Sequence, residues 1–285
     1  MKSSFICFLI ALVSNMYAPI CAKPDTSNII IIADVHGDIN RFRYILRDAG
    51  IIDKYDSWIA PSYTTVVQLG DQIDPKDQKK EDDDKKHHFD VIYFTYRLEF
   101  LASHYNSTFI NLIGNHEYYN IDKIRNNREL SHIIANRPII KQIGDKLFCH
   151  ASFKTIHYLI MQQYNITFQD INDLWYNYVK NYTLSPVEQY LVKMLITDAD
   201  SIIFTKTQDE ASAINVLFNR INVTNMFVGH KITEYVHVKN NVWFLDQTLK
   251  DAFDKSIYTY ITIQNDEIIV KSPRKRWFWI DFFYV

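Results

Sequence analysis

Residues 28–38 read Asn-Ile-Ile-Ile-Ile-Ala-Asp-Val-His-Gly-Asp, an apolar run that ends in a group of polar residues. An unbroken apolar run of this kind is typical of a β-strand that is covered on both faces, as in α/β proteins. The polar residues Asp34 and His36 stand where this strand ends. Segment 39–49 has apolar residues at helical spacing and precedes Gly50, a residue type that often follows a helix. The stretch therefore predicts a strand, a polar loop and a helix.

The same order, an apolar run followed by polar residues, recurs along the chain. Segments 65–69, 108–113, 147–148 and 226–228 lead into Gly70-Asp71, Gly114-Asn115-His116, Cys149-His150 and Gly229-His230, respectively. In open α/β sheets, ligands bind beyond the carboxyl ends of the strands, so we expect these groups to converge on one crevice. Segments 242–246, 257–263 and 267–271 are predicted as later strands, the last two joined as a hairpin. We expect these later strands to form a second sheet that packs on the first.

The length of 285 residues without an internal repeat predicts one domain, residues 23–285. Residues 1–22 are predicted to be a signal peptide, with Lys2, an apolar run and Ala22 as a small residue before the cleavage point. An uncleaved signal anchor is the alternative, but the apolar run is shorter than the roughly 20 residues that span a bilayer. The protein is therefore expected in the secretory pathway, either secreted or in the ER lumen.

Four Asn-x-Ser/Thr triplets are candidate glycosylation sites in such a compartment, although such triplets also arise by chance in an Asn-rich chain. They begin at Asn106, Asn165, Asn181 and Asn222.

Charge and composition limit the partners of the protein. The formal net charge is -2, whereas a nucleic-acid-binding surface normally shows a strongly basic footprint, so no nucleic-acid partner is expected. Segment 75–88 carries mixed charges and no apolar anchor, which predicts a mobile solvated loop from which Lys76 could reach a phosphate. The tail 274–285 is basic and then aromatic. It predicts either weak contact with a membrane surface or a final strand that covers the core.

The residues at the strand ends have the chemistry of a metal site. Carboxylate and imidazole ligands suit Mn, Fe or Zn ions, and a shared carboxylate such as Asp71 can hold two divalent ions close together. Of the six glycines in the chain, four adjoin these candidate ligands, as expected for tight turns with positive φ. Cys149 lies in an apolar strand and is expected to be a buried, inert thiol rather than a nucleophile.

The ordered set of motifs resembles the calcineurin-like metallophosphoesterase superfamily, in its phosphoprotein-phosphatase-type branch. The motifs are Asp-x-His-Gly-Asp at 34–38, Gly-Asp-x-x-Asp at 70–74, Gly-Asn-His-Glu at 114–117, a His at 150 and Gly-His at 229–230. Asn120, Arg137-Pro138 and Val-Trp-Phe-Leu-Asp at 242–246 are similar to features of the Shewanella-like protein phosphatases within that branch. The resemblance implies a four-layer α/β/β/α sandwich with two mixed sheets and a metal site at the carboxyl ends of the strands.

The resemblance also implies roles for individual residues. Two divalent ions are expected, with Mn as the first choice and Fe or Zn as alternatives, and a hydroxide that bridges them is expected to attack phosphorus in line. His116 is expected to be the general acid that protonates the leaving oxygen, and Asp74 is expected to orient it. The metal ligands implied by the resemblance are Asp34, His36 and Asp71 for the first ion, and Asp71, Asn115, His150 and His230 for the second.

Two departures from the family pattern concern phosphate binding. Where the family continues its Gly-Asp-x-x-Asp motif with an Arg, this chain has Pro75 and Lys76, and a Trp-x-Arg-like motif is replaced by Ile-Phe-Thr-Lys at 203–206. Lys206 could hold phosphate as a point charge, or it could be an ordinary surface lysine. Without arginine forks, the stabilisation of charge in the transition state should be weaker.

The sequence thus predicts a metal-dependent phosphomonoesterase, with a phosphorylated protein or a small phosphoester as its substrate. A protein phosphatase is the first expectation. The alternatives are a nucleotide or dinucleoside-polyphosphate hydrolase, and a secreted metal-binding glycoprotein with weak or no catalysis.

Overall fold

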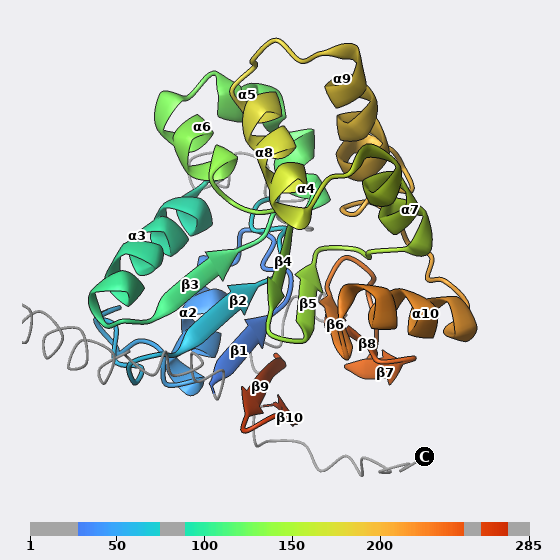
Figure 1. The fold of residues 1–285 in the computed structure, drawn as a ribbon. Helices are drawn as coiled ribbons and strands as arrows, with labels where there is room; N and C mark the ends of the chain where they lie inside the picture. Colours follow the sequence, from blue (N-terminus) through green and yellow to red (C-terminus); the bar gives the residue numbers. More distant parts are fainter. Residues whose placement is uncertain (1–27, 75–88, 248–257, 273–285) are drawn as a thin grey trace, which may run out of the picture.

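The computed structural model describes residues 28–74, 89–247 and 258–272, which form two five-stranded mixed sheets packed face to face (Figure 1). The first sheet has the strand order β10 (Glu267–Lys271), β9 (Tyr260–Gln264), β1 (Ile29–Ile32), β2 (Thr65–Gln68) and β3 (Thr108–Asn111). The second has the order β4 (Ile140–Ile143), β5 (Lys146–Cys149), β6 (Asn225–Val228), β8 (Val242–Phe244) and β7 (His237–Lys239). Three adjacent strands of each sheet run parallel, namely β1, β2 and β3 in the first and β5, β6 and β8 in the second.

Helices cover the two outer faces of this sandwich (Figure 1). The first sheet packs against α2 (Ile39–Asp48) and α3 (Asp90–His104). The helical layer of the second sheet consists of α4 (Asn115–Tyr119), α5 (Ile121–Arg125), α6 (Arg128–Ala135), α7 (Thr155–Tyr164), α8 (Phe168–Val179), α9 (Pro186–Val192), the π-helical segment η2 (Lys193–Thr197) and α10 (Ala211–Ile221). The order of layers is therefore α/β/β/α.

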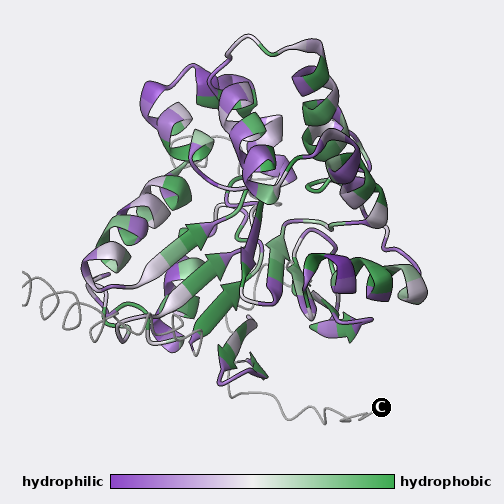
Figure 2. Ribbon diagram, viewed as in Figure 1, coloured by the Kyte–Doolittle hydropathy of each residue, from purple (hydrophilic) through white to green (hydrophobic). Residues whose placement is uncertain are grey.

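Alternating side chains of the strands enter different cores, because successive residues of a strand point to opposite faces. Ile29 and Ile31 pack in the core between the sheets, whereas Ile30 and Ile32 pack against the helices of the first sheet. In the second sheet, Phe148 and Phe227 stack between the sheets with ring centroids 5.3 Å apart. In Figure 2, β1 is accordingly hydrophobic along its whole length. This double burial explains why the strands read as continuous apolar runs.

The predicted fold class is confirmed, but the predicted sheet of the C-terminal hairpin is wrong. Strands β9 and β10 do form a hairpin, and its turn residues Asn265 and Asp266 both have positive φ, as a type I′ turn requires. However, β9 pairs antiparallel with β1 and so extends the first sheet. Its apolar residues Ile261 and Ile263 reach the core between the sheets from that side. Either sheet would bury such a strand, so its hydrophobic pattern does not identify its partner.

Several sequence predictions fall outside the described residues. They are the signal peptide at 1–22, the charged loop at 75–88 with Lys76, and the basic and aromatic tail at 274–285. In the parts of the chain that the structure describes, no helix combines the length and the apolar character needed to cross a bilayer.

Candidate metal centre

The loops that follow the strands converge where the carboxyl ends of the two sheets meet. In Figure 1 the arrowheads of β1, β2 and β3 point the same way, toward the middle of the molecule. The backbone N–H groups of Val35 and His36 both donate to the carbonyl of Asp71, at 3.0 and 2.9 Å, which ties the loop after β1 to the loop after β2. In the second sheet, Gly229 donates to the carbonyl of His150 at 2.8 Å. The residues predicted as metal ligands therefore lie together although they are distant in the sequence.

The glycines of these loops serve two different purposes. Gly37 and Gly70 have positive φ, as predicted. Gly114 has a φ of -107°, and a Cβ on it would overlap the Oδ1 atom of Asp71. A Cβ on Gly229 would likewise overlap Oδ1 of Asp34. At these two positions, glycine allows the backbone to approach a carboxylate closely, and positive φ is not the reason at Gly114.

Two groups of potential metal ligands share the carboxylate of Asp71. Oδ2 of Asp71 lies 3.8 Å from Nε2 of His36 and 3.3 Å from Nε2 of His150. Within each group the ligand atoms lie within 4.8 Å of one another, and the groups are His36, Asp71 and His116, and Asp71, His150 and His230. Asp34 Oδ2 lies 3.6 Å from Nε2 of His36, and Asn115 Oδ1 lies 2.9 Å from Nε2 of His150. A carboxylate between two such groups is the arrangement that suits a pair of ions.

Hydrogen bonds from the outer side orient the imidazoles. The Nδ1–H of His36 donates to the carbonyl of Asp74 at 3.2 Å, so that Nε2 faces the carboxylates. His150 donates from Nδ1 to the carbonyl of Leu69 at 2.7 Å, and His230 donates from Nε2 to the carbonyl of Phe204 at 3.0 Å. Each bond selects the tautomer that leaves the other ring nitrogen free to bind a metal, as in many metalloproteins.

One buried nitrogen atom without a hydrogen-bond partner indicates that these residues fit a metal ion. Nε2 of His36 is buried and has no hydrogen-bond partner among the described residues, although it points at the carboxylates of Asp34 and Asp71. A buried polar atom without a partner is costly, and a divalent cation between these groups would remove that cost. The carboxylate, imidazole and amide donors suit Mn, Fe or Zn.

The charges in the site also favour a cation. Although burial opposes ionisation, the neighbouring imidazoles, chiefly that of His150, hold the pKa of Asp71 well below its ordinary value. Burial disfavours the charged form of His150, yet Asp71 and Asp34 raise its pKa to about 10. This imidazole would carry a proton at neutral pH unless a cation took its place. Burial and the charge of His150 lower the pKa of His230 to about 4, so the imidazole of His230 is neutral at neutral pH.

His116, like His230, is only half-buried, whereas His36 and His150 are buried. Its side chain is 26% exposed, and its Nδ1 atom lies 3.0 Å from Oδ2 of Asp74. Burial opposes protonation, but the hydrogen bond with Asp74 and the charge of Asp71 raise the pKa of His116 above its ordinary value. Nε2 of His116 lies 3.8 Å from Oδ2 of Asp71. An imidazole that binds a proton more readily than an ordinary histidine therefore stands next to the shared carboxylate.

Glu117 has a structural part in the site that its sequence motif did not predict. Its fully buried carboxylate accepts the backbone N–H groups of Asp71, Gln72 and Gly114 at distances of 2.8 to 3.0 Å. Burial and the charge of Asp71 raise the pKa of Glu117. Glu117 thus fastens the loop that carries Asp71 to the start of α4. Its place in Gly-Asn-His-Glu was visible in the sequence, but the donors that it binds were not.

The structure also locates the remaining predicted residues. Lys206 is exposed, and its positive charge makes a small contribution to the lowered pKa of His230. Cys149 is fully buried and lies 3.9 Å from the sulfur of Met226, and burial raises the pKa of its thiol, as expected of an inert residue. The asparagines of the four sequons are all exposed, and all have positive φ; they are Asn106, Asn165, Asn181 and Asn222.

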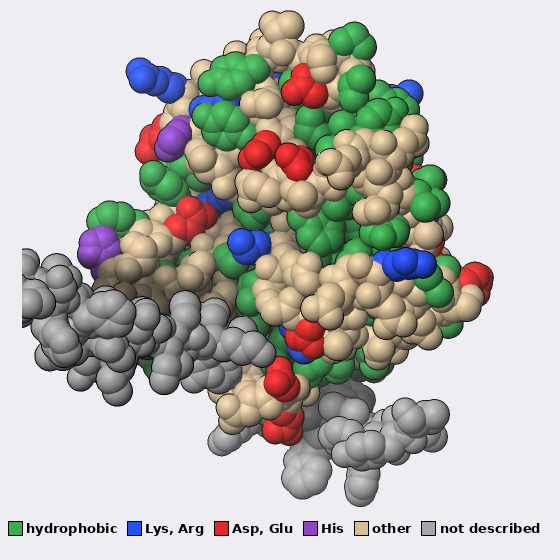
Figure 3. Space-filling view, in the orientation of Figure 1, with side chains coloured by type: hydrophobic (Ala, Val, Ile, Leu, Met, Phe, Trp, Pro, Cys, Tyr) green, Lys and Arg blue, Asp and Glu red, His purple; other side chains and the backbone are tan. Residues whose placement is uncertain are grey.

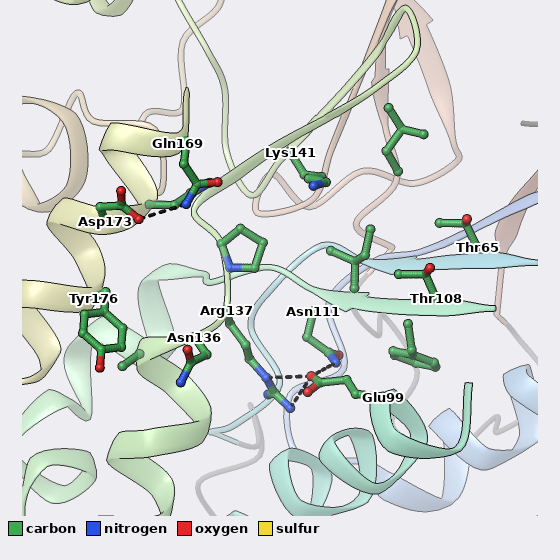
Figure 4. A pocket seen from close by; sticks show the side chains of 16 residues that line it. Thr65, Glu99, Thr108, Asn111, Asn136, Arg137, Lys141, Gln169, Asp173 and Tyr176 are labelled. Carbon is green, nitrogen blue, oxygen red and sulfur yellow. Dashed lines mark hydrogen bonds and ion pairs between the residues drawn. The ribbon is translucent and has the colours of Figure 1, made fainter. Parts of the chain in front are cut away.

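A cavity of about 600 Å³ lies away from these ligands, between β3, β4, α6 and α8 (Figure 4). Arg137 lines this cavity, but its guanidinium group donates to Glu99, Gln72, Thr95 and the carbonyl of Ile92. It is thus committed to the protein interior and does not replace a phosphate-binding arginine. On the face drawn in Figure 3, Lys and Arg side chains are scattered among Asp and Glu side chains.

Comparison with known proteins gives the same assignment as the geometry. The model of the family described as calcineurin-like phosphoesterase matches residues 27–232. Shewanella-like protein phosphatase 2 of Arabidopsis thaliana is 32% identical over 100 residues, which are 35% of this chain and 22% of that protein. Shewanella-like protein phosphatase 1 of Plasmodium berghei (strain Anka) is 35% identical over 94 residues, or 33% of this chain and 23% of that protein. The matched stretch thus spans less than a quarter of either relative.

Solved structures agree on the fold. A cold-active protein-tyrosine phosphatase of a psychrophilic Shewanella species superimposes with a TM-score of 0.69 at 17% identity, covering 86% of this chain and 78% of that chain. A protein serine/threonine phosphatase of Saccharomyces cerevisiae superimposes with a TM-score of 0.55 at 13% identity, covering 90% and 82% of the two chains. At these identities, the comparison supports the architecture alone.

Proposed function

The chain belongs to the calcineurin-like phosphoesterase family, and from this premise we propose that it hydrolyses phosphomonoesters on proteins with the help of two divalent ions. The observation that supports this most directly is the carboxylate of Asp71, which is shared by two ligand groups and stands beside the Asp74–His116 pair. Under this proposal, the metal ligands are Asp34, His36, Asp71, Asn115, His150 and His230.

When bound, the two ions would activate a water molecule as nucleophile and offset the negative charge of the phosphoryl group. The protein's own residues complete the reaction. As the ester P–O bond breaks, its electron pair stays with the leaving oxygen, and His116 gives that oxygen its Nε2 proton. Asp74 accepts the Nδ1–H of His116 and so keeps the ring in position. Lys206 would add a positive charge near the phosphate, though without the two-point geometry of an arginine.

The rings of Tyr119 and Phe204 form an aromatic wall beside His116. This wall supports aryl phosphates, such as phosphotyrosine, as the preferred substrates. Tyr119 is 64% exposed, and its ring lies 5.9 Å from that of His116 and 5.4 Å from that of Phe204. The carbonyl of Phe204 in turn binds His230, so the wall adjoins the proposed metal ligands. An aromatic leaving group that takes its proton from His116 could pack against these rings, which an aliphatic one would do less well.

The experiment that tests the proposed function compares Mn-loaded wild-type protein with Asp71→Asn and His116→Asn proteins. The substrates are an aryl phosphate, phosphotyrosine and phosphoserine peptides, and a dinucleoside polyphosphate. We expect kcat/KM to fall by about 10²- to 10⁴-fold in the His116 variant on the phosphopeptides, the range typical of a lost general acid. Wild-type turnover no greater than that of the Asp71 variant would leave a metal-binding glycoprotein as the function. A preference for the dinucleoside polyphosphate would exclude a protein phosphatase.

A substitution of Tyr119 tests the substrate preference separately. With Tyr119→Ala, we expect the ratio of kcat/KM for phosphotyrosine over phosphoserine peptides to fall by about tenfold, equivalent to the loss of one aromatic contact. Tyr105→Ala serves as a matched control, since Tyr105 is also an exposed tyrosine, 47% exposed, and caps the end of α3. An unchanged ratio in the Tyr119 variant would show that the wall does not select the substrate.

The location of the protein stays a proposal that rests on the sequence. We propose that the chain enters the secretory pathway, with the exposure of the four sequon asparagines as a structural condition that glycosylation would require.

A further inference from the structure

The Asp74–His116 pair is held by a third side chain, that of Asn120. Asn120 ends α4, and it is 5% exposed. Its Nδ2 group donates to Oδ2 of Asp74 at 2.6 Å and to the backbone carbonyl of His116 at 3.0 Å. The same amide therefore contacts both members of the pair.

A lysine fixes the orientation of this amide. Nζ of Lys123 donates to Oδ1 of Asn120 at 2.9 Å. An ammonium group can only donate and a carboxylate can only accept, so a flipped amide would set its NH₂ against Lys123 and its oxygen against Asp74. The amide thus has one orientation, in which both N–H groups and the oxygen are bound.

Asp74 needs such a restraint more than a carboxylate in regular structure does. Its backbone is in the left-handed region, with a φ of 61°, and its side chain is 29% exposed. The Oδ2 atom that Asn120 binds is the one that lies 3.0 Å from Nδ1 of His116. Asn120 therefore holds the acceptor atom that sets the angle of the His116 ring.

We propose that Asn120, with its amide held by Lys123, is a positioning residue for the leaving-group acid. The proposal rests on the function proposed for His116. In the reaction, His116 loses its Nε2 proton to the leaving oxygen and is re-protonated from solvent, while its Nδ1–H bond to Asp74 stays in place. Asn120 is not among the proposed metal ligands, and it acts through Asp74 by keeping Nε2 of His116 directed at the leaving oxygen.

A series of leaving groups separates this role from a general structural one. Loss of acid catalysis matters most when the leaving oxygen is basic, so phenyl phosphate should suffer more than p-nitrophenyl phosphate. With Asn120→Ala, we expect kcat for phenyl phosphate to fall by about 10- to 100-fold, and kcat for p-nitrophenyl phosphate to fall only by about two- to threefold. Lys123→Ala, a change at an exposed residue, should show the same selectivity to a smaller extent. Asn126→Ala, an exposed asparagine that ends α5, is the matched control and should leave both rates unchanged.

Combined variants connect the effect to His116. In a His116→Asn background, Asn120→Ala should cause no further loss that depends on the leaving group, because the acid is already absent. Equal losses on both substrates in the Asn120 and Lys123 variants, or losses that add fully to that of His116→Asn, would overturn the positioning role alone. If wild-type protein hydrolysed neither substrate, or if His116→Asn kept full activity on phenyl phosphate, the proposed function would fail and this role with it.

Discussion

At the scale of single residues, the proposed site is built on unusual backbone. Four of its side chains stand on left-handed backbone, with φ between 50° and 61°; they are His36, Asp71, Asp74 and His230. Such conformations cost on the order of 1 kcal/mol each and occur where the surroundings enforce them. Asparagine tolerates this region well, which makes Asp71→Asn a variant that removes charge without adding backbone strain.

Two glycine substitutions distinguish the need for space from the need for positive φ. Gly114→Ala places a methyl group against Asp71, and we expect metal affinity and kcat/KM to fall by tenfold or more because the shared carboxylate must move. Gly50→Ala meets nothing within 4 Å, but it has a φ of 69°. It should lower the free energy of unfolding by about 1 kcal/mol and leave activity unchanged. Metal titration and denaturant unfolding of both variants check this, and full activity of the Gly114 variant would contradict it.

A buried histidine outside the site makes the stability depend on pH. Burial lowers the pKa of His157 to about 4, and its Nε2–H donates to the carbonyl of Asp200 while Nδ1 accepts from the backbone N–H of Lys154. Between pH 6.5 and 4 the unfolded chain binds a proton that the folded protein does not, so stability falls as the pH falls through this range. We expect a loss on the order of 3 kcal/mol across it.

Substitution of His157 tests this assignment. His157→Gln can make both hydrogen bonds but cannot titrate, so its free energy of unfolding should depend less on pH below 6.5. Urea unfolding of both proteins at pH 7 and pH 5 measures the difference. Parallel pH profiles would assign the acid sensitivity to other groups.

At the scale of elements, the sequon asparagines have a structural function of their own. Asn165 and Asn222 end α7 and α10 with φ of 51° and 55°, and Asn106 and Asn181 stand just past the ends of α3 and α8 with similar φ. Asparagine is, after glycine, the residue that best terminates a helix in this conformation. The triplets are therefore explained as helix ends, whether or not they are also glycosylated.

The two functions of Asn165 can be tested apart. Asn165→Gly removes the glycan acceptor but keeps the left-handed helix end, whereas Asn165→Ala should cost an additional 1 kcal/mol or so in stability. The change is made at Asn165 because Thr167 caps the start of α8 and its loss would disturb that helix. Both proteins are expressed through a secretory pathway and treated with a glycosidase. We expect the mass removed by this treatment to be smaller by one glycan in Asn165→Gly than in the wild-type protein. If the treatment removed the same mass from both proteins, this sequon would not be used.

The helices and strands could be predicted from the sequence more accurately than the pairing of the strands or the hydrogen-bond partners in the site. Strand β1 and the loop after it were readable because a short contiguous stretch contains both the double-sided burial and the polar residues. The placement of β9 was not readable, since its pattern is equally compatible with either sheet. In the site, Glu117 and Asn120 were visible in a motif, but their roles depend on donors and acceptors up to 46 residues away. Such partners are set by the tertiary fold.

At the scale of the whole molecule, the proposed metal centre joins the two sheets. Asp34, His36 and Asp71 follow strands of the first sheet, whereas His150 and His230 follow strands of the second. An ion that binds this set binds only the folded protein and therefore stabilises it. Metal loading should thus raise the resistance of both sheets to unfolding together.

Metal removal tests this prediction. With free metal at about 100 times its dissociation constant, we expect about 2.7 kcal/mol of added stability, which a chelator abolishes. In Asp71→Asn protein, the chelator should have little effect because the shared ligand is weakened. Calorimetric scans with and without chelator provide the measurement, and an equal shift in both proteins would place the stabilising ion elsewhere.

The stack of Phe148 on Phe227 lies two and three residues before His150 and His230 along their strands, in the core between the sheets. Both rings belong to neighbouring strands of the second sheet, so a substitution that repacks them should shift the ends of the strands that carry His150 and His230 relative to the first sheet. Under the proposed function, substitutions of these interior aromatic residues should therefore impair turnover as well as stability. Over evolutionary time, sequence drift in this layer should consequently be slower than in the two outer helical layers.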